Sequence, residues 1–273
     1  MKISCYTHSG LVRKNNEDSC LVVPPWSELA IDGGICLFLV TDGMGGQNAG
    51  EVASAIAVKS SKSWLLNHLE DELTEEFVED MVMNVNQEVW KYSQEHSEAT
   101  GMGTTYTAVL ISKSKAIVGH VGDSRLYRVR NEKLEQLSKD HSLVAEQVRM
   151  GKLTPEQARV HPTRNILSRV VGGRQFIKPD VFPIDLAEND TIFICSDGIY
   201  GMIEDCLIEE ILIKHDVAIA AKELVDAANG AGGKDNSTSI VLNIGMLPIS
   251  FPGKLSFQRL KETFAHWGKV GFD

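Results

Sequence analysis

The chain has 273 residues, of which 43% are hydrophobic, so it can bury a sizeable core and does not have the composition of a disordered protein. Its formal net charge of −10, from 27 basic and 37 acidic residues, argues against nucleic acid or an anionic membrane as a partner. No apolar run approaches the roughly 20 residues of a membrane span, and no signal-peptide pattern opens the chain. The five cysteines have no metal-site or CxxC spacing and indicate reduced thiols in a cytoplasmic protein.

The first half of the chain alternates between groups of strands and a pair of helices. The periodicity predicts strands at 2–8, 19–23 and 35–42. It then predicts helices at about 49–69 and 75–94, the second with one apolar face: Val78, Met81, Val85, Val89 and Tyr92. A meander of short strands follows, with turns between them: 105–112, 115–122, 125–130 and 133–138.

The second half begins with a polar, helix-prone segment. Within it, Thr154, Pro155 and Gln157 have the spacing of a helical capping box, with proline at the first helical position. The pattern then predicts strands at 176–184 and 191–197, helices at 204–213 and 217–229, and a last strand at 237–245.

Strands in runs and helices in pairs are typical of an α+β fold in which helical pairs cover antiparallel sheets. No linker rich in Pro, Gly or Ser occurs before about residue 247. We therefore expect one domain over residues 1–246 and a C-terminal tail over residues 247–273.

Acidic residues recur at the ends of the predicted strands. Asp42, Asp123 and Asp197 close strands, and Asp235 precedes one. Carboxylates at strand ends of one core can meet, and their mutual repulsion then calls for a cation. Oxygen ligands favour Mg²⁺ or Mn²⁺ over zinc. The alternative is that each Asp-Gly pair is an ordinary turn, and the repetition of the arrangement argues for the metal site.

The segment "RKNNEDS" places Arg13, Glu17 and Asp18 just before a strand. A guanidinium binds phosphate through a planar two-pronged fork. Because carboxylate-held cations beside an arginine are typical of phosphoryl chemistry, we expect these residues to share the cleft with the strand-end aspartates.

Seven stretches make the sequence resemble the metal-dependent protein phosphatases of type 2C, in particular the bacterial members. They occur in the family's order over roughly residues 3–244: "SGLVRKNNEDS", "VTDGMGGQNAGEVAS", "GMGTTYTAVLI", "HVGDSRLYRVR", "LSKDHSLVAEQVRMGKLTPEQARVHPTRNILSRVVGG", "CSDGIYGMI" and "GGKDNSTSIVL". The resemblance implies a four-layer α-β-β-α sandwich that hydrolyses phosphoserine and phosphothreonine in proteins.

The resemblance also implies a centre of two Mg²⁺ or Mn²⁺ ions. Asp42 would bridge both ions, and the Gly43 carbonyl would be a further ligand. Asp197 and Asp235 would complete one of the two sites. In such centres a water shared by the two ions becomes a hydroxide at neutral pH and attacks phosphorus in line.

Other residues take their implied roles from the same resemblance. Glu17 and Asp18 would serve the second central ion, largely through waters. Asp123 and Asp197 would hold the third ion seen in bacterial relatives. Arg13 would bind the substrate phosphate, and residues 140–172 would form a mobile flap beside the cleft.

Met44 departs from the eukaryotic pattern, which has a histidine in this stretch. Methionine has no proton to donate, so another group, for which we consider a metal-bound water, must protonate the leaving oxygen. The implied partners are phosphorylated proteins, among them a cognate bacterial serine/threonine kinase and its targets. The alternative reading is a phosphatase-like module that binds phosphoproteins without turnover, and the complete set of acidic residues favours the enzyme.

The tail lies outside the resemblance. Phe257, Leu260, Phe264 and Trp267 recur at helical spacing and predict a short amphipathic helix. We expect this helix to dock on its own domain, with binding of a partner such as a cognate kinase or its scaffold as the alternative. Nothing in the sequence requires more than a monomer.

Overall fold

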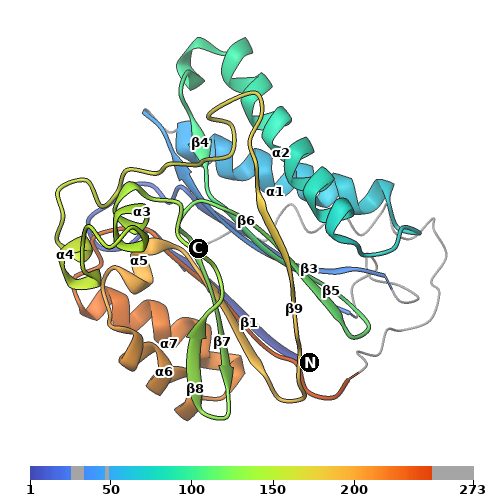
Figure 1. Ribbon diagram of the computed structural model, residues 1–273, viewed down its shortest axis with the longest axis vertical. Helices are drawn as coiled ribbons and strands as arrows, with labels where there is room; N and C mark the ends of the chain where they lie inside the picture. The colour runs from blue at the N-terminus through green and yellow to red at the C-terminus, as the bar shows by residue number, and fades with distance from the viewer. Residues whose placement is uncertain (26–33, 47–48, 248–273) are drawn as a thin grey trace.

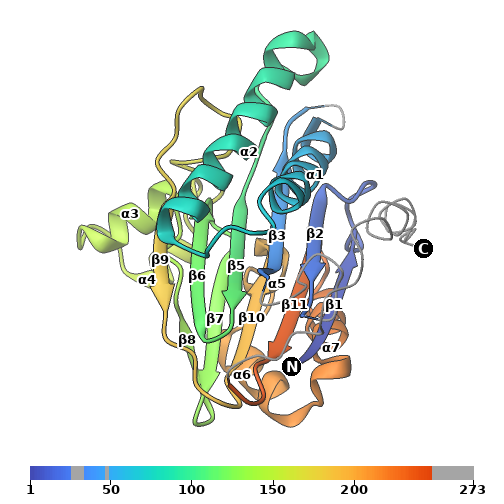
Figure 2. The ribbon, with the colours of Figure 1, turned by 90° about the vertical axis from the view of Figure 1, so that its right-hand side faces the viewer.

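The computed structural model describes residues 1–25, 34–46 and 49–247. In these ranges two antiparallel β-sheets pack face to face, and a pair of helices covers the outer face of each sheet (Figures 1 and 2). The predicted α+β class and the four-layer α-β-β-α sandwich are therefore confirmed.

One sheet has the strand order β1-β11-β10-β7-β8, so strands from both ends of the chain lie side by side in it. Its strands have these bounds: β1 Lys2–His8, β11 Ser237–Asn243, β10 Thr191–Cys195, β7 Arg125–Arg130 and β8 Lys133–Gln136. The N-terminal strand is thereby paired directly with the last strand of the domain.

The second sheet has the order β2-β3-β5-β6-β9, and the two-residue strand β4 pairs with the end of β3. Its strands have these bounds: β2 Asp18–Val23, β3 Cys36–Met44, β4 Gly103–Thr104, β5 Tyr106–Ser112, β6 Lys115–Val121 and β9 Asp180–Ile184. The 36–40 segment of β3 is buried on both faces, because helices cover one side and the other sheet covers the opposite side.

Helices α1 and α2 cover the six-stranded sheet, and α6 and α7 cover the five-stranded sheet (Figure 2). The helices have these bounds: α1 Ala49–Asn67, α2 Glu75–Glu95, the 3₁₀ turn η2 Ser97–Ala99, α3 Leu143–Arg149, α4 Pro155–Arg159, α5 Asp197–Tyr200, α6 Asp205–Lys214 and α7 Val217–Gly230. The predicted apolar face of α2 packs inward, with Val78, Met81, Val85 and Val89 fully buried.

Two predictions of local structure differ from the fold. The meander is divided: β5 and β6 belong to one sheet, whereas β7 and β8 belong to the other. The chain crosses between the sheets at the turn of residues 122–124. The strand predicted at 191–197 ends at Cys195, and Asp197 is instead the first residue of the short helix α5.

The flap segment, residues 140–172, carries α3 and α4 on one side of the sandwich (Figure 1). The capping box at the start of α4 is confirmed, since Thr154 and Gln157 each accept a hydrogen bond from the other's backbone N–H. No helix in the described ranges is long and apolar enough to cross a bilayer. The boundary at residue 246 stays a prediction, and the amphipathic helix predicted in the tail lies outside the described residues.

Candidate metal centre and active site

Five aspartates gather where the ends of the two sheets meet. Asp18 opens β2 and lies directly opposite Asp42 of β3 in the antiparallel register. Asp197 follows β10 and Asp235 precedes β11, so both come from the other sheet. Asp123 lies in the turn that connects the sheets. The predicted convergence is therefore observed, although Asp42 lies within β3 and Asp197 within α5 rather than at strand ends.

These carboxyl groups raise one another's pKa. Burial raises the pKa of Asp18 to about 7, with Asp197 and Asp235 adding to the shift. Burial and the nearby Asp235 raise the pKa of Asp197 to about 6. The pKa values of Asp42 and Asp123 are also raised, first by burial and then by the neighbouring aspartates. The cluster is therefore short of positive charge.

The Asp18 side chain is buried and only half satisfied. Its Oδ2 accepts a hydrogen bond of 2.7 Å from the Ser196 hydroxyl, which joins the two sheets. Its Oδ1 is buried and has no hydrogen-bond partner among the residues that the structure describes. A buried carboxylate oxygen without a partner is costly, and a cation beside it would remove that cost.

The backbone of Asp42 is fixed by the "GMGTT" stretch. Thr105 Oγ1 accepts from the Asp42 N–H at 2.8 Å, and Thr104 Oγ1 donates to the Asp42 carbonyl at 2.9 Å. The Thr105 N–H donates to the same carbonyl at 2.8 Å. This stretch forms the short strand β4 beside the end of β3 and sets the position of the Asp42 backbone.

Gly43 lies where three segments approach closely. A Cβ at this position would overlap the Gly50 carbonyl at the start of α1 and would lie 2.7 Å from the Glu17 carbonyl oxygen. The Gly43 N–H donates to that Glu17 carbonyl at 3.1 Å. The glycine therefore brings the end of β3, helix α1 and the Glu17 segment together.

Arg13 lies at the cluster and donates to Asp235 Oδ2 at 2.8 Å, with half of its side chain exposed. Asn236 fixes the loop that carries Arg13, since its amide donates to the carbonyls of Ser9 and Asn15. The Asn236 Oδ1 also accepts from the Glu17 N–H at 2.8 Å. One side chain beside β11 thus positions the N-terminal loop.

The turn that bears Asp123 is held from two sides. His141 Nδ1 accepts from the Gly122 N–H at 3.1 Å, and the His141 N–H donates to the Gly122 carbonyl at 2.8 Å. The other ring nitrogen of His141 lies 3.1 Å from Asp180 Oδ2, which fixes the ring tautomer. Tyr200 donates to the Asp123 carbonyl at 3.0 Å.

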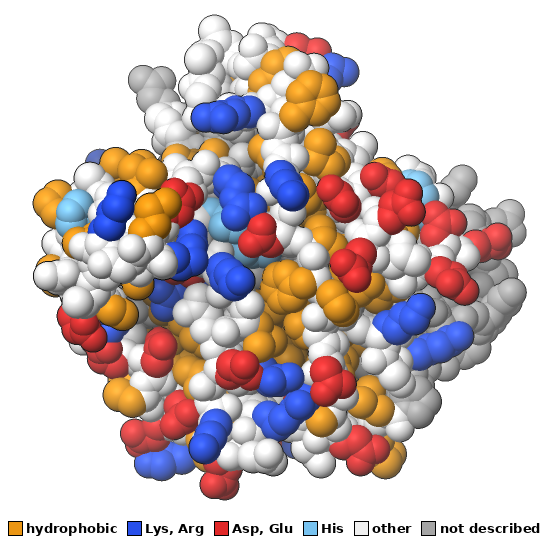
Figure 3. Space-filling view, viewed as in Figure 1, with side chains coloured by type: hydrophobic (Ala, Val, Ile, Leu, Met, Phe, Trp, Pro, Cys, Tyr) orange, Lys and Arg blue, Asp and Glu red, His pale blue; other side chains and the backbone are white. Residues whose placement is uncertain are grey.

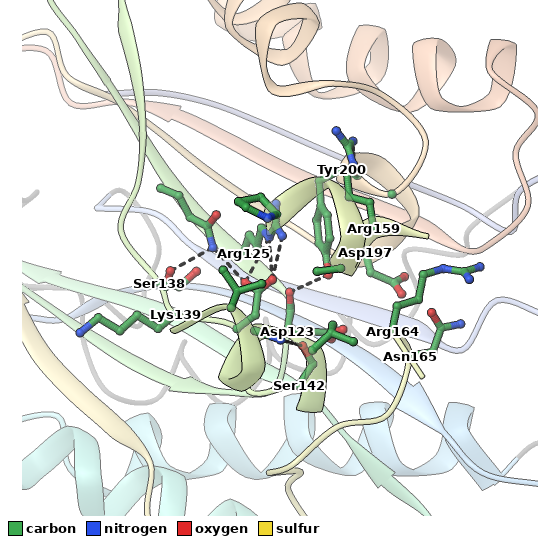
Figure 4. Close-up of a pocket in the computed structure, with 18 of the residues that line it drawn as sticks. Asp123, Arg125, Ser138, Lys139, Ser142, Arg159, Arg164, Asn165, Asp197 and Tyr200 are labelled. Atoms are coloured by element: carbon green, nitrogen blue, oxygen red, sulfur yellow. Dashed lines mark hydrogen bonds and ion pairs between the residues drawn. The ribbon is translucent and has the colours of Figure 1, made fainter. Parts of the chain in front are cut away.

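A pocket of about 660 Å³ adjoins the carboxylates (Figure 4). Asp123 and Asp197 line this pocket together with flap residues that include Ser142, Arg159 and Arg164. Arg125 lines the pocket, pairs with Asp140 at 2.7 Å and stacks 3.7 Å above the Tyr200 ring centroid. The flap therefore borders the predicted cleft.

The molecular face of Figure 3 mixes basic and acidic side chains rather than presenting a single sign. Met44 is 40% exposed at the end of β3, beside the carboxylate cluster.

A divalent cation suits this cluster by its donors, which are carboxylates, and by the unpartnered buried Oδ1 of Asp18. Within residues 1–25, 34–46 and 49–247, no three His, Cys, Asp or Glu side chains are already arranged to hold an ion. Backbone carbonyls and waters would therefore have to contribute ligands, as in other Mg²⁺ and Mn²⁺ sites.

Sequence reasoning missed the residues that hold these carboxylates in place. They act through contacts far apart in the chain: Thr104, Thr105, Asn236, Ser196, His141 and Tyr200. The sequence offered a signal for two of them, because Ser196 and Asn236 are adjacent to the predicted ligands Asp197 and Asp235.

Residues 13–225 match the protein-family model described as Protein phosphatase 2C. The chain belongs to this family. It is also 36% identical to the serine/threonine phosphatase stp of Listeria monocytogenes over 240 residues, which cover 86% of this chain and 93% of that protein. As a member of the type 2C family, the chain is a metal-dependent protein serine/threonine phosphatase.

Solved structures agree with this assignment to the type 2C phosphatases. The Mycobacterium tuberculosis serine/threonine phosphatase PstP/Ppp has a TM-score of 0.80 and 31% identity, covering 90% of this chain and 99% of that one. The PstP catalytic domain in complex with two manganese ions has a TM-score of 0.77 and 30% identity, covering 90% and 98%.

Proposed function

We propose that this phosphatase hydrolyses phosphoserine and phosphothreonine in proteins at a centre of two Mg²⁺ or Mn²⁺ ions held by its carboxylate cluster. The observation that carries this proposal is the meeting of Asp18, Asp42, Asp197 and Asp235 from two sheets, with a buried oxygen of Asp18 unpartnered. The two manganese ions of the PstP complex support it.

The proposed ligands follow the positions of the side chains. Asp42 lies opposite Asp18 and near Asp197, which suits a ligand shared by both ions. Asp197, Asp235 and the Gly43 carbonyl would complete one site.

Two further assignments concern the rest of the cluster. Glu17 and Asp18 would serve the second central ion, largely through waters. Asp123, which shares the pocket with Asp197, would hold a third ion together with it.

When bound, the ions would supply an activated water and neutralise charge on the phosphoryl oxygens. The chain's own residues orient the substrate. Arg13 is half exposed and pairs with Asp235, so its guanidinium can receive a phosphate group at the edge of the cluster. The thioether of Met44 has no proton to give, so the leaving serine or threonine oxygen takes its proton from water.

A direct test uses the full chain and an aryl phosphate. We expect turnover that depends on added Mn²⁺ or Mg²⁺, that EDTA abolishes, and that Asp42→Asn removes. Binding of a phosphopeptide without turnover at any metal concentration would instead identify a phosphoprotein-binding module.

We further propose that the substrates include a cognate serine/threonine kinase and that kinase's targets, and that the enzyme acts as a monomer in the cytoplasm. The five free thiols of the chain support a reducing compartment. Phosphoproteomics of a deletion strain against an Asp42→Asn strain would identify the substrates, since their sites should gain phosphate in both strains.

A further inference from the structure

Two cysteines on different sheets touch at one edge of the sandwich. Cys5 lies on β1, an edge strand of the five-stranded sheet, and Cys20 lies on β2, an edge strand of the six-stranded sheet. Their Sγ atoms are 3.1 Å apart. The two thiols therefore make a direct contact between the two sheets at an edge of the sandwich.

The other cysteines of the chain offer no such contact. Cys36 and Cys195 are buried in the cores, and Cys206 on α6 is exposed with no thiol neighbour. As whole residues, Cys5 is exposed and Cys20 is partly exposed, and the contact with Cys20 together with burial of the thiol raises the pKa of Cys5. A disulfide has a sulfur–sulfur distance of about 2.05 Å, so a shift of roughly 1 Å between two edge strands would form the bond.

We propose that Cys5 and Cys20 form a reversible disulfide, which makes the pair a redox modification site. The oxidant would be a small-molecule disulfide, RSSR. The thiolate of one cysteine attacks RSSR, forms a mixed disulfide and releases one RS⁻. The second thiolate then attacks the protein sulfur of the mixed disulfide, forms the Cys5–Cys20 bond and releases the second RS⁻. The two protein thiols are oxidised, and one RSSR is reduced to two thiols.

The bond would close a ring around the N-terminal loop. The cysteines are 15 positions apart, and the residues between them include Arg13 and Glu17. The side-chain amide of Asn236 already holds this loop through hydrogen bonds to the backbone of Ser9, Asn15 and Glu17. A covalent link at the ends of the loop would reduce its freedom further, because it restricts the separation of β1 from β2.

The proposal is independent of the metal assignments, so its test does not require an active enzyme. The full chain is equilibrated in mixtures of reduced and oxidised glutathione, and the bond is read by intact mass and peptide mapping. We expect a loss of about 2 Da and a linked pair of peptides containing Cys5 and Cys20. A reductant should restore the original mass.

Three variants complete the experiment. Cys5→Ser and Cys20→Ser should abolish the loss of mass, whereas Cys206→Ser should leave it unchanged. The oxidised wild-type chain should melt roughly 5 °C above its reduced form, a difference absent from Cys5→Ser. Its residues 9–17 should also exchange their amide hydrogens more slowly.

Several outcomes would overturn the proposal. Separate glutathione adducts on Cys5 and Cys20 in the folded protein would show that the thiols do not join. A disulfide through Cys206 or between two chains would do the same. A linked form that melts at or below the temperature of the reduced protein would contradict the stabilisation of the loop.

Discussion

Asp18 and Asp42 lie directly opposite each other on neighbouring strands, and the buried Oδ1 of Asp18 has no hydrogen-bond partner in the described part of the chain. Two like charges in this relationship destabilise a sheet. The pair therefore costs folding free energy, and the proposed metal centre would offset this cost. This relationship connects stability to activity in a way that substitutions can test.

Asp42→Asn removes one charge of this pair. In EDTA we expect the variant to unfold at a higher temperature than the wild type, because repulsion with Asp18 disappears. With Mn²⁺ we expect kcat/KM to fall roughly 10³-fold, because a ligand of the centre is lost. Thermal melts and phosphopeptide hydrolysis measure the two effects. Asp226→Asn on the exposed face of α7 is the control. Equal changes in melting temperature and in kcat/KM for the two variants would refute the proposed role of Asp42 in the carboxylate cluster.

The metal-free protein should lose stability as the pH rises. The pKa of Asp18 is about 7 and that of Asp197 about 6 in the folded state, both above the ordinary value near 4. The folded chain therefore binds protons more tightly than the unfolded chain. This contribution is fully present below about pH 4 and is lost as the pH rises through about 7.

Melts in EDTA at pH 5 and pH 7.5 measure this loss, and saturating Mn²⁺ should reduce it. Asp18→Asn should also flatten the dependence on pH. A metal-free wild type whose stability rises between these pH values would contradict the raised pKa values.

Arg13→Ala should raise KM for a phosphopeptide by roughly tenfold with a smaller change in kcat, because a charge-assisted contact to phosphate is lost. Arg13→Lys should recover only part of the loss, since an ammonium cannot make the two-pronged contact. Steady-state kinetics measure both. The neighbouring exposed Lys14→Ala is the matched control, and an equal change in KM for Lys14→Ala would exclude a specific role for Arg13.

Gly198→Ala tests the close approach of α5 to the segment before β11. A Cβ at Gly198 would overlap the Asn236 carbonyl, so we expect a loss of about 1–3 kcal/mol in the free energy of unfolding. Because Asn236 holds the N-terminal loop, activity should fall as well. Urea denaturation measures stability. Gly230→Ala, where a Cβ meets open space, should be neutral or slightly stabilising.

His141 should hold the turn of Asp123 through its ring. His141→Leu leaves the buried Gly122 N–H without an acceptor and should cost about 1–3 kcal/mol in the free energy of unfolding. His141→Asn keeps an oxygen near the position of Nδ1 and should recover part of that loss. Urea denaturation compares the two with His161→Leu, which removes a half-buried ring that hydrogen-bonds to the neighbouring Thr163. A His141→Leu variant as stable as His161→Leu would exclude this role.

Much of the fold could be predicted from local patterns. The helices at 49–67 and 75–95 and the capping box at Thr154 follow from periodicity and end signals that act over a few residues. The division of the meander could not be predicted in this way. The patterns of β6 and β7 both predict strands, but neither indicates which sheet its strand joins, so the change of sheet at Gly122 depends on contacts made in the folded core.

The acidic members of the cluster were predictable because each stands next to a strand-like pattern in the sequence, although the structure places Asp42 within β3 and Asp197 within α5. Their supporting partners were not, since a hydrogen bond from Ser196 to Asp18 or from Asn236 to Ser9 joins positions more than 170 residues apart. The contact between Cys5 and Cys20 likewise depends on the packing of the two sheets, which brings the edge strands β1 and β2 together. Nothing in a local pattern indicates such contacts.

The carboxylates come from two separate sheets, so the packing between these sheets determines how far apart the carboxylates lie. Asp18 and Asp42 move with one sheet, and Asp197 and Asp235 are attached to the other. The spacing between these two halves is set by apolar side chains such as Ile194 and Ile240 in the interior. Substitutions deep in the sandwich can therefore change the separation between the two pairs of carboxylates without touching any of them.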